Sequence, residues 1–414
     1  MPVIAADLII ETPDPVITIL NTAPNTGFYV QGHVGSAMLG VEYTDYSFDP
    51  VETQDWAKPS LTAGIAFGWD TMLSGNLVGG VELRYDLFNA DFAPFADAGL
   101  GTLFSFQDTI SATGKLGYLV APGTQIYGVL GLGSAGVEAP EGFDGFANGR
   151  ANGWVAGIGA EARISELLSA TVEARYFRSL DAFATADEVD FVPHYLTVTT
   201  GLRYRFGDDG GAGDFDPIDF DFTGPNIGLS AIAAAGSMER AVSTPGAETG
   251  PFFAEGAGIG ASVGFDFAIN DDWVVGLLAG VDYHPLTFND AAADSPVVDA
   301  TTEFAYVDTV VAIGGRIGAK VNPQTLLYGK LAYAAIHTSA NEDFFALGGG
   351  GEEWLSGTQI GLGIETAISD SVTLGIEGTY TSAFDALVTE NTQLDQIELT
   401  PSILAAKATL KYHF

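Results

Sequence analysis

Acidic and basic side chains recur at every second position in several segments of this sequence. In GGVELRYDL, Glu82 and Arg84 alternate with Val81, Leu83 and Tyr85. This spacing places the charges on one face of an extended strand, because successive side chains point to opposite sides. Carboxylates and cations that share a face can form ion pairs, or they can line a pore and select the solutes that pass.

One small or polar strand face collects most of the basic residues. Of the 15 Lys and Arg, all but Lys58, Arg150, Arg178 and Arg240 lie on it. The cations on this face are Arg84, Lys115, Arg163, Arg175, Arg203, Arg205, Arg316, Lys320, Lys330, Lys407 and Lys411. The carboxylates that share it are Glu82, Glu161, Glu173, Asp282, Glu365 and Glu377. The surplus of acid therefore lies in the connecting segments.

Catalytic chemistry has one local candidate. His337, Thr338 and Ser339 beside Glu342 contain the residue types of a nucleophile, a base and an orienting acid. Neighbouring residues on a strand point to opposite faces, so the segment does not predict an assembled site. We expect His33 and His413 to be hydrogen-bonded residues on the charged face. The sequence predicts no enzyme.

Two other patterns could hold ligands. The acidic run at residues 207–221, GDDGGAGDFDPIDFD, offers carboxylates to a hard cation but lacks the spacing of an EF-hand. GxG runs such as GIGAE lie inside predicted strands with no helix after them, so they do not predict a nucleotide loop. We therefore predict a solvated linker at 207–221 and no cofactor or metal site.

The charged residues can share one face only if they lie on strands. Alternation of apolar with polar or small residues predicts eight strands in the first half, near residues 27–44, 61–70, 77–87, 107–120, 125–137, 153–164, 169–179 and 194–206. Three connections are tight, at 71–76, 121–124 and 165–168, whereas others are long and acidic or Gly-rich, such as 45–60 and 138–152. This alternation predicts an all-β fold, an antiparallel up-and-down β-barrel whose strands are long enough to cross a bilayer.

The second half repeats the first. GYLVAPGTQIYGVLG matches GAKVNPQTLLYGKLA, with Pro122 and Pro323 at the same place, and GIGAEARIS matches GLGIETAIS. The two copies end on Phe206 and Phe414. Because strand residues, turns and spacings agree together, we interpret the chain as an internal duplication.

Composition excludes other classes. The 414 residues include 53 Gly and no Cys, which excludes disulfides and thiol nucleophiles. No apolar run reaches the roughly 18 residues of a membrane helix. A formal net charge of −38 repels phosphate backbones, so no nucleic-acid partner is expected.

The face opposite the charges is apolar, as a surface in contact with lipid must be. Aromatic residues near strand ends are expected to form girdles at the two membrane interfaces. These residues are Trp69, Tyr85, Trp154, Tyr176, Tyr204, Tyr283, Tyr380 and Tyr412.

The last strand carries Leu410, Tyr412 and Phe414 on one face. With the loop alternation and the charged inner face, the chain resembles the outer-membrane β-barrel superfamily, in the style of small opacity-protein and porin-family barrels of Gram-negative bacteria. The resemblance implies the bacterial outer membrane as the location, its lipid as a partner, and a terminal aromatic signal recognised by the barrel-assembly machinery. The tandem duplication departs from the usual single barrel. The acidic loops argue against binding of lipopolysaccharide by basic residues.

Two arrangements of the copies remain open. In the first, residues 25–206 and 225–414 each form an eight-stranded barrel, joined by an acidic linker at 207–224. The alternative is one sixteen-stranded barrel. The long, acidic linker favours the first arrangement, because the other connections at that end are tight. Residues 1–24 resemble the end of an export signal followed by a periplasmic leader, and we expect an upstream signal.

Two functions follow from the charged inner face. If its charges pair within a narrow lumen, the protein has a structural or surface-interaction role and displays acidic loops outside the cell, with divalent cations as candidate partners of those loops. If the lumen is open, the protein is a porin-like channel for small solutes or ions. We favour the first function.

Overall fold

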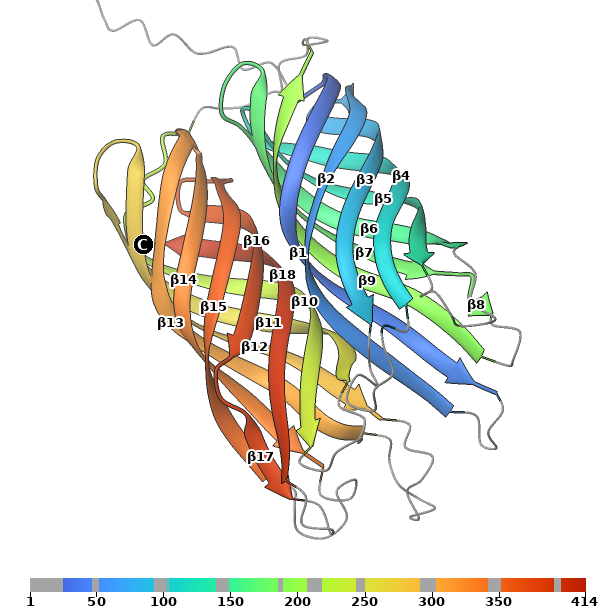
Figure 1. Cartoon of the computed structure of the whole chain (residues 1–414). Coiled ribbons are helices and arrows are strands. Elements are labelled where there is room, and N and C mark those ends of the chain that lie inside the picture. Colours follow the sequence, from blue (N-terminus) through green and yellow to red (C-terminus); the bar gives the residue numbers. More distant parts are fainter. Residues whose placement is uncertain are drawn as a thin grey trace, which may run out of the picture.

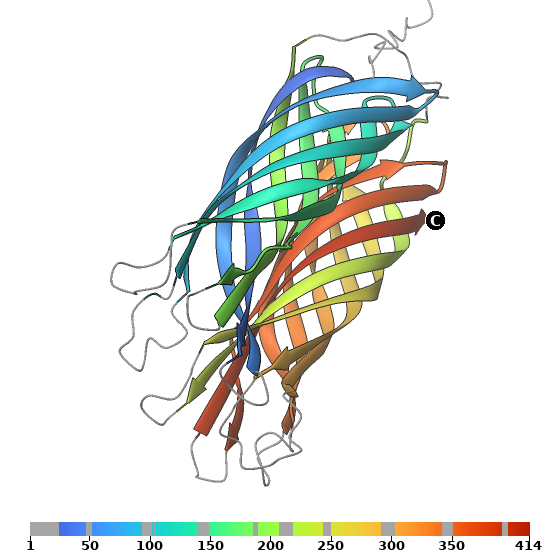
Figure 2. The same ribbon diagram turned by 90° about the vertical axis from the view of Figure 1, so that its right-hand side faces the viewer.

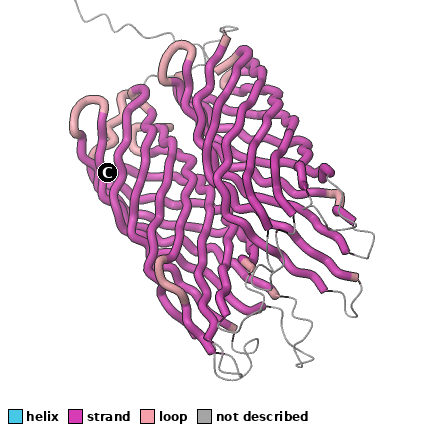
Figure 3. The backbone as a smooth tube through the Cα atoms, viewed as in Figure 1, coloured by secondary structure: helices cyan, strands magenta, loops and turns pink. Residues whose placement is uncertain are grey.

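The computed structural model describes residues 25–46, 52–92, 102, 104–138, 149–184, 189–206, 218–242, 250–290, 303–341, 351–390 and 396–414. These residues form strands, turns and short loops (Figure 3). Among them no helix is long and apolar enough to cross a membrane. The all-β prediction is confirmed.

The first copy forms a closed ring of strands. Its strands are β1 (Gly27–Asp45), β2 (Glu52–Ser74), β3 (Leu77–Phe92), β4 (Phe104–Ala121), β5 (Thr124–Glu138), β6 (Gly149–Arg163), β7 (Leu168–Ser179), the short β8 (Phe183–Ala184) and β9 (Val189–Arg205). Each long strand pairs antiparallel with the next along the chain. The ring closes where β9 pairs with β1, with Tyr29 opposite Arg205.

The second copy closes in the same way. Its strands are β10 (Gly224–Val242), β11 (Pro251–Ala268), β12 (Trp273–Asn289), β13 (Glu303–Asn322), β14 (Thr325–Ala340), β15 (Gly351–Ala367), β16 (Val372–Ala383), the short β17 (Leu387–Glu390) and β18 (Gln396–His413). The last strand pairs with β10, with Asn226 opposite His413. The registers therefore give two eight-stranded barrels, the favoured arrangement.

The two barrels lie side by side, as both views show (Figures 1 and 2). Within the part of the chain that the structure describes, one backbone pairing joins their rings, between Phe252 in β11 and Trp56 in β2. Apolar side chains pack in part of the seam between them. They include Met38, Leu196 and Val198 from the first copy and Phe253 and Leu404 from the second. The seam therefore buries outer faces that a single barrel would turn to lipid.

Several strands extend further toward the long-loop end than the alternation predicts. The prediction of a loop at 45–60 is wrong for residues 52–60. These residues belong to β2, which begins at Glu52 and pairs with β1 as far as Asp45. Trp56 lies in this extension and is buried inside the barrel. A tilted crossing needs only about 9–11 residues, so the loop-side ends of these strands rise above the hydrocarbon region.

Two predicted girdle residues are placed differently. Tyr176 and Tyr380 pack in the seam between the barrels rather than against lipid. The alternation could not reveal this, because a face that packs on a second barrel is as apolar as a face that meets lipid. Tyr412, in contrast, is half exposed on the outer surface, at 45%.

Candidate functional site

The half of the first barrel nearest the tight turns holds a buried network of charges. Equal numbers of carboxylates and permanent cations form it within the described residues: Asp70, Glu82, Asp86, Glu161 and Glu173 with Arg84, Lys115, Arg175, Arg203 and Arg205. Every one of these side chains is buried. Charges removed from water must be paired, and here they balance.

Glu161 is the most connected carboxylate of this network. Arg203 donates to it at 2.6 Å and Arg205 at 2.7 Å, while the Lys115 ammonium lies 3.6 Å away. Gln125 donates a further hydrogen bond at 2.7 Å. The strand alternation sends all of these side chains inward from β4, β5, β6 and β9, so the network forms only when the ring closes.

Glu173 organises the next layer. It accepts hydrogen bonds from Arg84 and Arg175, each at 2.5 Å, and from the Tyr127 hydroxyl at 2.8 Å. Arg84 also binds Asp86, which pairs with His33 at 2.8 Å. His33 therefore lies in the lumen and is hydrogen-bonded.

The second barrel repeats this network with smaller side chains. Arg316 bridges Asp266 and Glu365 at 2.7 and 2.6 Å, and Lys411 and His413 also bind Glu365. Lys330 binds Glu377 at 2.5 Å, and Lys407 binds Asp282. Positive and negative charges again balance among the described residues in ion pairs.

The two lumens differ in how completely they are filled. Asn226 in β10 occupies the register position that Tyr29 has in β1. In the same way, Lys411 in β18 occupies the position that Arg203 has in β9. A cavity of about 60 Å³ remains in the second barrel, bordered by Asn226, Lys411 and Lys407 among others. Such a polar cavity has room for a few water molecules.

Two of the predicted lumen cations lie at the tight-turn rim instead. Lys320 sits over the ring of Phe222, 5.9 Å from its centroid. Arg163 is the last residue of β6 and packs against the tight turn at Gly123. A Cβ added at Gly123 would lie 3.0 Å from the Cβ of Arg163.

The sequence analysis missed three lumen carboxylates, Asp70, Asp86 and Asp266. All three follow the inward parity of their strands, and Asp70 and Asp266 occupy equivalent registers, opposite Gly27 and Gly224. Parity together with the duplication could have found them. It also missed Tyr127 and Tyr328, whose hydroxyls donate to Glu173 and Glu377.

The long-loop half of each lumen is mainly apolar. The second barrel also holds a buried ion pair there, because Arg240, which the sequence analysis set apart from the charged face, packs on the rings of Phe252 and Phe304 and pairs with Asp290. In the first barrel this apolar cluster includes Trp56, Phe88, Phe106, Phe177 and Tyr195. Phe106 and Tyr195 pack edge to face, with ring centroids 5.9 Å apart.

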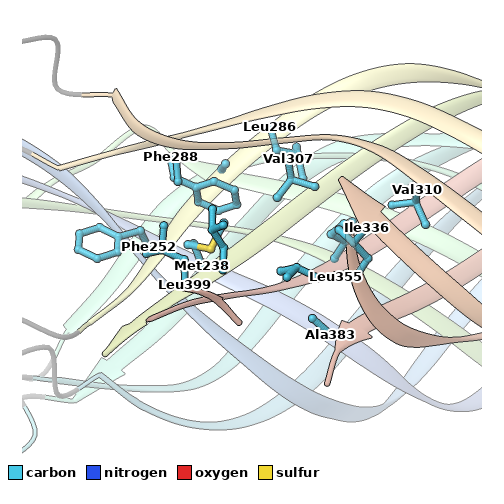
Figure 4. Close-up of a cluster of buried hydrophobic side chains, with 14 of the residues drawn as sticks. Met238, Phe252, Leu286, Phe288, Val307, Val310, Ile336, Leu355, Ala383 and Leu399 are labelled. Atoms are coloured by element: carbon cyan, nitrogen blue, oxygen red, sulfur yellow. The ribbon is translucent and has the colours of Figure 1, made fainter. Parts of the chain in front are cut away.

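The matching apolar cluster of the second barrel includes Met238, Phe252, Leu286, Phe288 and Ile336 (Figure 4). These side chains converge on the barrel axis from several strands. Each lumen therefore has an ionic layer near the tight turns and a mainly apolar layer toward the long loops.

The linker closes the tight-turn end of the second barrel. Phe220 and Phe222 are buried against His413 and Tyr328, and the Phe220 N–H donates to the Pro323 carbonyl. The prediction of a solvated linker is wrong for this part, because two aromatic rings seal the barrel mouth. Its preceding acidic part, residues 207–217, lies outside the described residues.

His337 lies on the outer surface near the long-loop end. Its Nδ1 lies 2.9 Å from a carboxylate oxygen of Asp308 and its Nε2 lies 2.7 Å from a carboxylate oxygen of Glu352. Burial alone would lower the pKa of His337, but the two carboxylates raise it above its ordinary value. Both ring nitrogens are thus engaged by acids rather than by Ser339, and Glu342 lies outside the described residues.

The two terminal strands end alike. The Phe414 N–H donates to the Pro225 carbonyl at 3.1 Å, and the Phe206 N–H donates to the Phe28 carbonyl at 2.9 Å. Both aromatic side chains are exposed on the outer surface, Phe414 at 71% and Phe206 at 67%. Leu410 and Tyr412 share this outer face with Phe414.

Comparison with known proteins supports this architecture. The model of the outer membrane protein beta-barrel domain family matches the chain twice, over residues 20–206 and 219–414. No curated protein matches the sequence.

Among solved structures, Neisserial surface protein A is similar to 44% of this chain over 98% of its own length, at 15% identity and a TM-score of 0.30. The attachment invasion locus protein Ail of Yersinia pestis is similar to 45% of this chain over 99% of its own, at 14% identity and a TM-score of 0.27. The toluene transporter TodX of Pseudomonas putida covers 95% of this chain and 91% of its own, at 11% identity and a TM-score of 0.27. The family match in both copies is the finding that decides: this chain belongs to the outer membrane protein beta-barrel domain family and is a protein of the bacterial outer membrane.

Proposed function

We propose that this protein is a sealed, structural component of the outer membrane that displays acidic loops at the cell surface. One observation carries the proposal: in each barrel, a charge-balanced ion network and an apolar cluster occupy successive layers of the same lumen.

Each layer opposes the passage of solutes for its own reason. An ion that entered the ionic layer would have to break buried pairs such as Arg203 with Glu161, and breaking a buried pair is costly because it leaves an uncompensated charge. A hydrated solute in the mainly apolar layer would meet aromatic side chains such as Phe106 and Phe288, which offer no hydrogen bonds. The two barriers act in series.

The outer connections supply the displayed surface. In the sequence, the segments 46–51, 93–103, 139–148, 180–188, 243–250, 290–302, 341–350 and 384–395 contain acidic residues and neither Lys nor Arg. Most of these residues lie outside the described part of the chain. Hard divalent cations are the natural counterions of such loops, because they favour carboxylate oxygens. A calcium titration followed by calorimetry should therefore show binding that high ionic strength weakens.

A porin-like channel is the second candidate. The cavity of about 60 Å³ in the second barrel favours it, because Lys407 and Lys411 border that cavity together with Asp282 and Glu377. Phe222 closes one side of this lumen and Phe288 lies in the apolar cluster on the other. Conduction would require both closures to move.

Single-channel recording in planar bilayers tests the choice. We expect the full chain to insert without producing conductance steps, with insertion checked by protease protection of the loops. The channel candidate requires steps whose size or ion selectivity changes in Lys407→Gln. Arg150→Gln is the matched control, because it removes one positive charge from an exposed pair with Asp108. Steady steps from the parent would overturn the sealed-barrel proposal.

A further inference from the structure

An apolar groove with a cavity of about 610 Å³ lies along the seam between the barrels. Val34 and Val198 of the first copy form one wall, and Leu331, Ile360 and Leu362 of the second copy form the other. Val34, Leu331 and Ile360 are half exposed or more, so the groove opens to the surroundings of the barrels.

Glycines on the outer face of the second barrel make room for the groove. A Cβ at Gly378 would lie 1.9 Å from Val198 Cγ1, so the first barrel presses directly on this edge of the groove. A Cβ at Gly329 would make only ordinary contact, 3.5 Å from Leu362 Cδ2. The groove is therefore closed at Gly378 and spacious at Gly329.

The depth of the groove places its spacious end, at Gly329, in the hydrocarbon region of the periplasmic leaflet and its upper end just past the middle of the bilayer. Leu331 is six positions from the first residue of β14, Thr325, and Ile360 is seven positions from the last residue of β15, Ala367. A tilted strand climbs about 2.5 Å per residue along the membrane normal. Leu331 and Ile360 thus lie roughly 15–18 Å from the tight-turn ends, just beyond the middle of an apolar band about 25 Å tall, whereas Gly329, four positions from Thr325, lies about 10 Å from those ends. An acyl chain that enters from the periplasmic leaflet at Gly329 can therefore extend along the groove to the bilayer middle.

The seam is packed on both sides of this depth. Toward the loops, Met38 and Leu196 meet Phe253. Toward the tight turns, Val172 packs with Ile364 and Ile376, and Thr124 Oγ1 lies 2.8 Å from Thr325 Oγ1. The groove is thus an unfilled stretch of an otherwise continuous interface.

Water does not suit this space. A buried water needs two to four polar partners, whereas the Thr200 hydroxyl in the wall already donates to the Thr171 carbonyl at 3.1 Å. The lining also includes Ser36, Thr199, Thr379 and Tyr380, and Arg316 and Lys330, whose charged groups pair with carboxylates inside the second barrel. The side chains that form the two walls, Val34, Val198, Leu331, Ile360 and Leu362, are aliphatic. Hydrocarbon is the material at this depth of a bilayer, and its burial against the groove removes no polar group from a partner.

We propose that an acyl chain of a phospholipid from the periplasmic leaflet occupies the groove as a resident lipid that completes the seam between the barrels. This inference rests on the membrane location and is independent of whether the lumens conduct.

Native mass spectrometry of the full chain, released from native membrane extracts in mild detergent, tests it. We expect the parent to retain phospholipid. Gly329→Leu fills the groove from the second barrel and Val34→Trp fills it from the first. Either should lower retention by about tenfold, the effect of losing roughly 1.4 kcal/mol of contact.

Ala261→Leu is the matched control, because Ala261 is exposed on the outer face of β11 and does not line the groove. Heat-modifiable migration on gels checks that each variant folds. If Gly329→Leu or Val34→Trp fails to fold, the other variant still tests the proposal. Retention of lipid A alone, no retained lipid in the parent, or equal retention by the filled variants and the control would overturn the proposal.

Discussion

Glu173 and Glu377 occupy equivalent places in the two barrels but differ in their surroundings. Glu173 holds two arginines and a tyrosine in a filled lumen, whereas Glu377 holds Lys330 beside the cavity of about 60 Å³. The same substitution at both sites therefore compares a dry network with one that water can enter.

We predict that Glu173→Gln destabilises the first barrel by about 3–5 kcal/mol, because buried guanidinium groups lose their counterion. Glu377→Gln should cost less, since water in the cavity can solvate the lysine ammonium groups. Guanidinium unfolding of the detergent-folded protein measures both changes. Arg150→Gln breaks a more exposed pair and should change little. Equal losses at the two glutamates would show that the cavity has no influence.

His337 predicts a pH dependence of stability. Because its carboxylate partners raise its pKa in the folded state, their stabilising contribution is complete below the ordinary histidine pKa of about 6.5. This stabilising contribution is lost as the pH rises through the higher pKa that His337 has in the folded state. His337→Asn should therefore lower the unfolding midpoint most between about pH 5 and 6.5, by an amount equivalent to about 0.2–1 kcal/mol. If the difference in unfolding midpoint between the parent and His337→Asn instead widens above neutral pH, the predicted direction of the effect is wrong.

The terminal strands are the element on which assembly is expected to depend. Deletion of Phe414 should reduce the amount of protein inserted in the outer membrane, because we infer that the assembly machinery reads an aromatic at the chain end. Phe206→Ala is the control, since Phe206 has a similar exposure and an equivalent backbone hydrogen bond but is followed by the second copy. Membrane fractionation with heat-modifiable gels measures both. Normal insertion without Phe414 would refute the terminal signal.

Strand alternation predicted the fold from sequence because its period of two is geometric. It placed Glu82, Glu161 and Arg203 in the lumen, where they pair. It could not give the length of β2, because segment 52–60 combines inward Trp56 with Pro59 and shows no clean alternation. It also could not show that Phe220 and Phe222 fold back under the second barrel, because that contact depends on tertiary structure.

At the scale of the whole molecule, the duplication predicts two copies but not the contact between them. Tyr176, Val198 and Tyr380 have the outward parity of lipid-facing residues and nevertheless pack in the seam. No local pattern separates the two environments, because protein and lipid both demand apolar side chains at this depth. The seam and its groove could therefore be found only from the three-dimensional arrangement.

Each copy closes into a complete barrel of its own. In the structure, β9 returns to β1 and β18 returns to β10, so each long strand has its two ladder neighbours within its own copy, and the Phe252–Trp56 pairing is an additional contact between the copies. Expressing residues 1–206 and 207–414 as separate chains tests the claim most directly. We expect each half to fold as a compact, heat-modifiable monomer that inserts into membranes. If both halves aggregate or dimerise through unpaired edges, the two copies do not close independently and the two-barrel account is wrong.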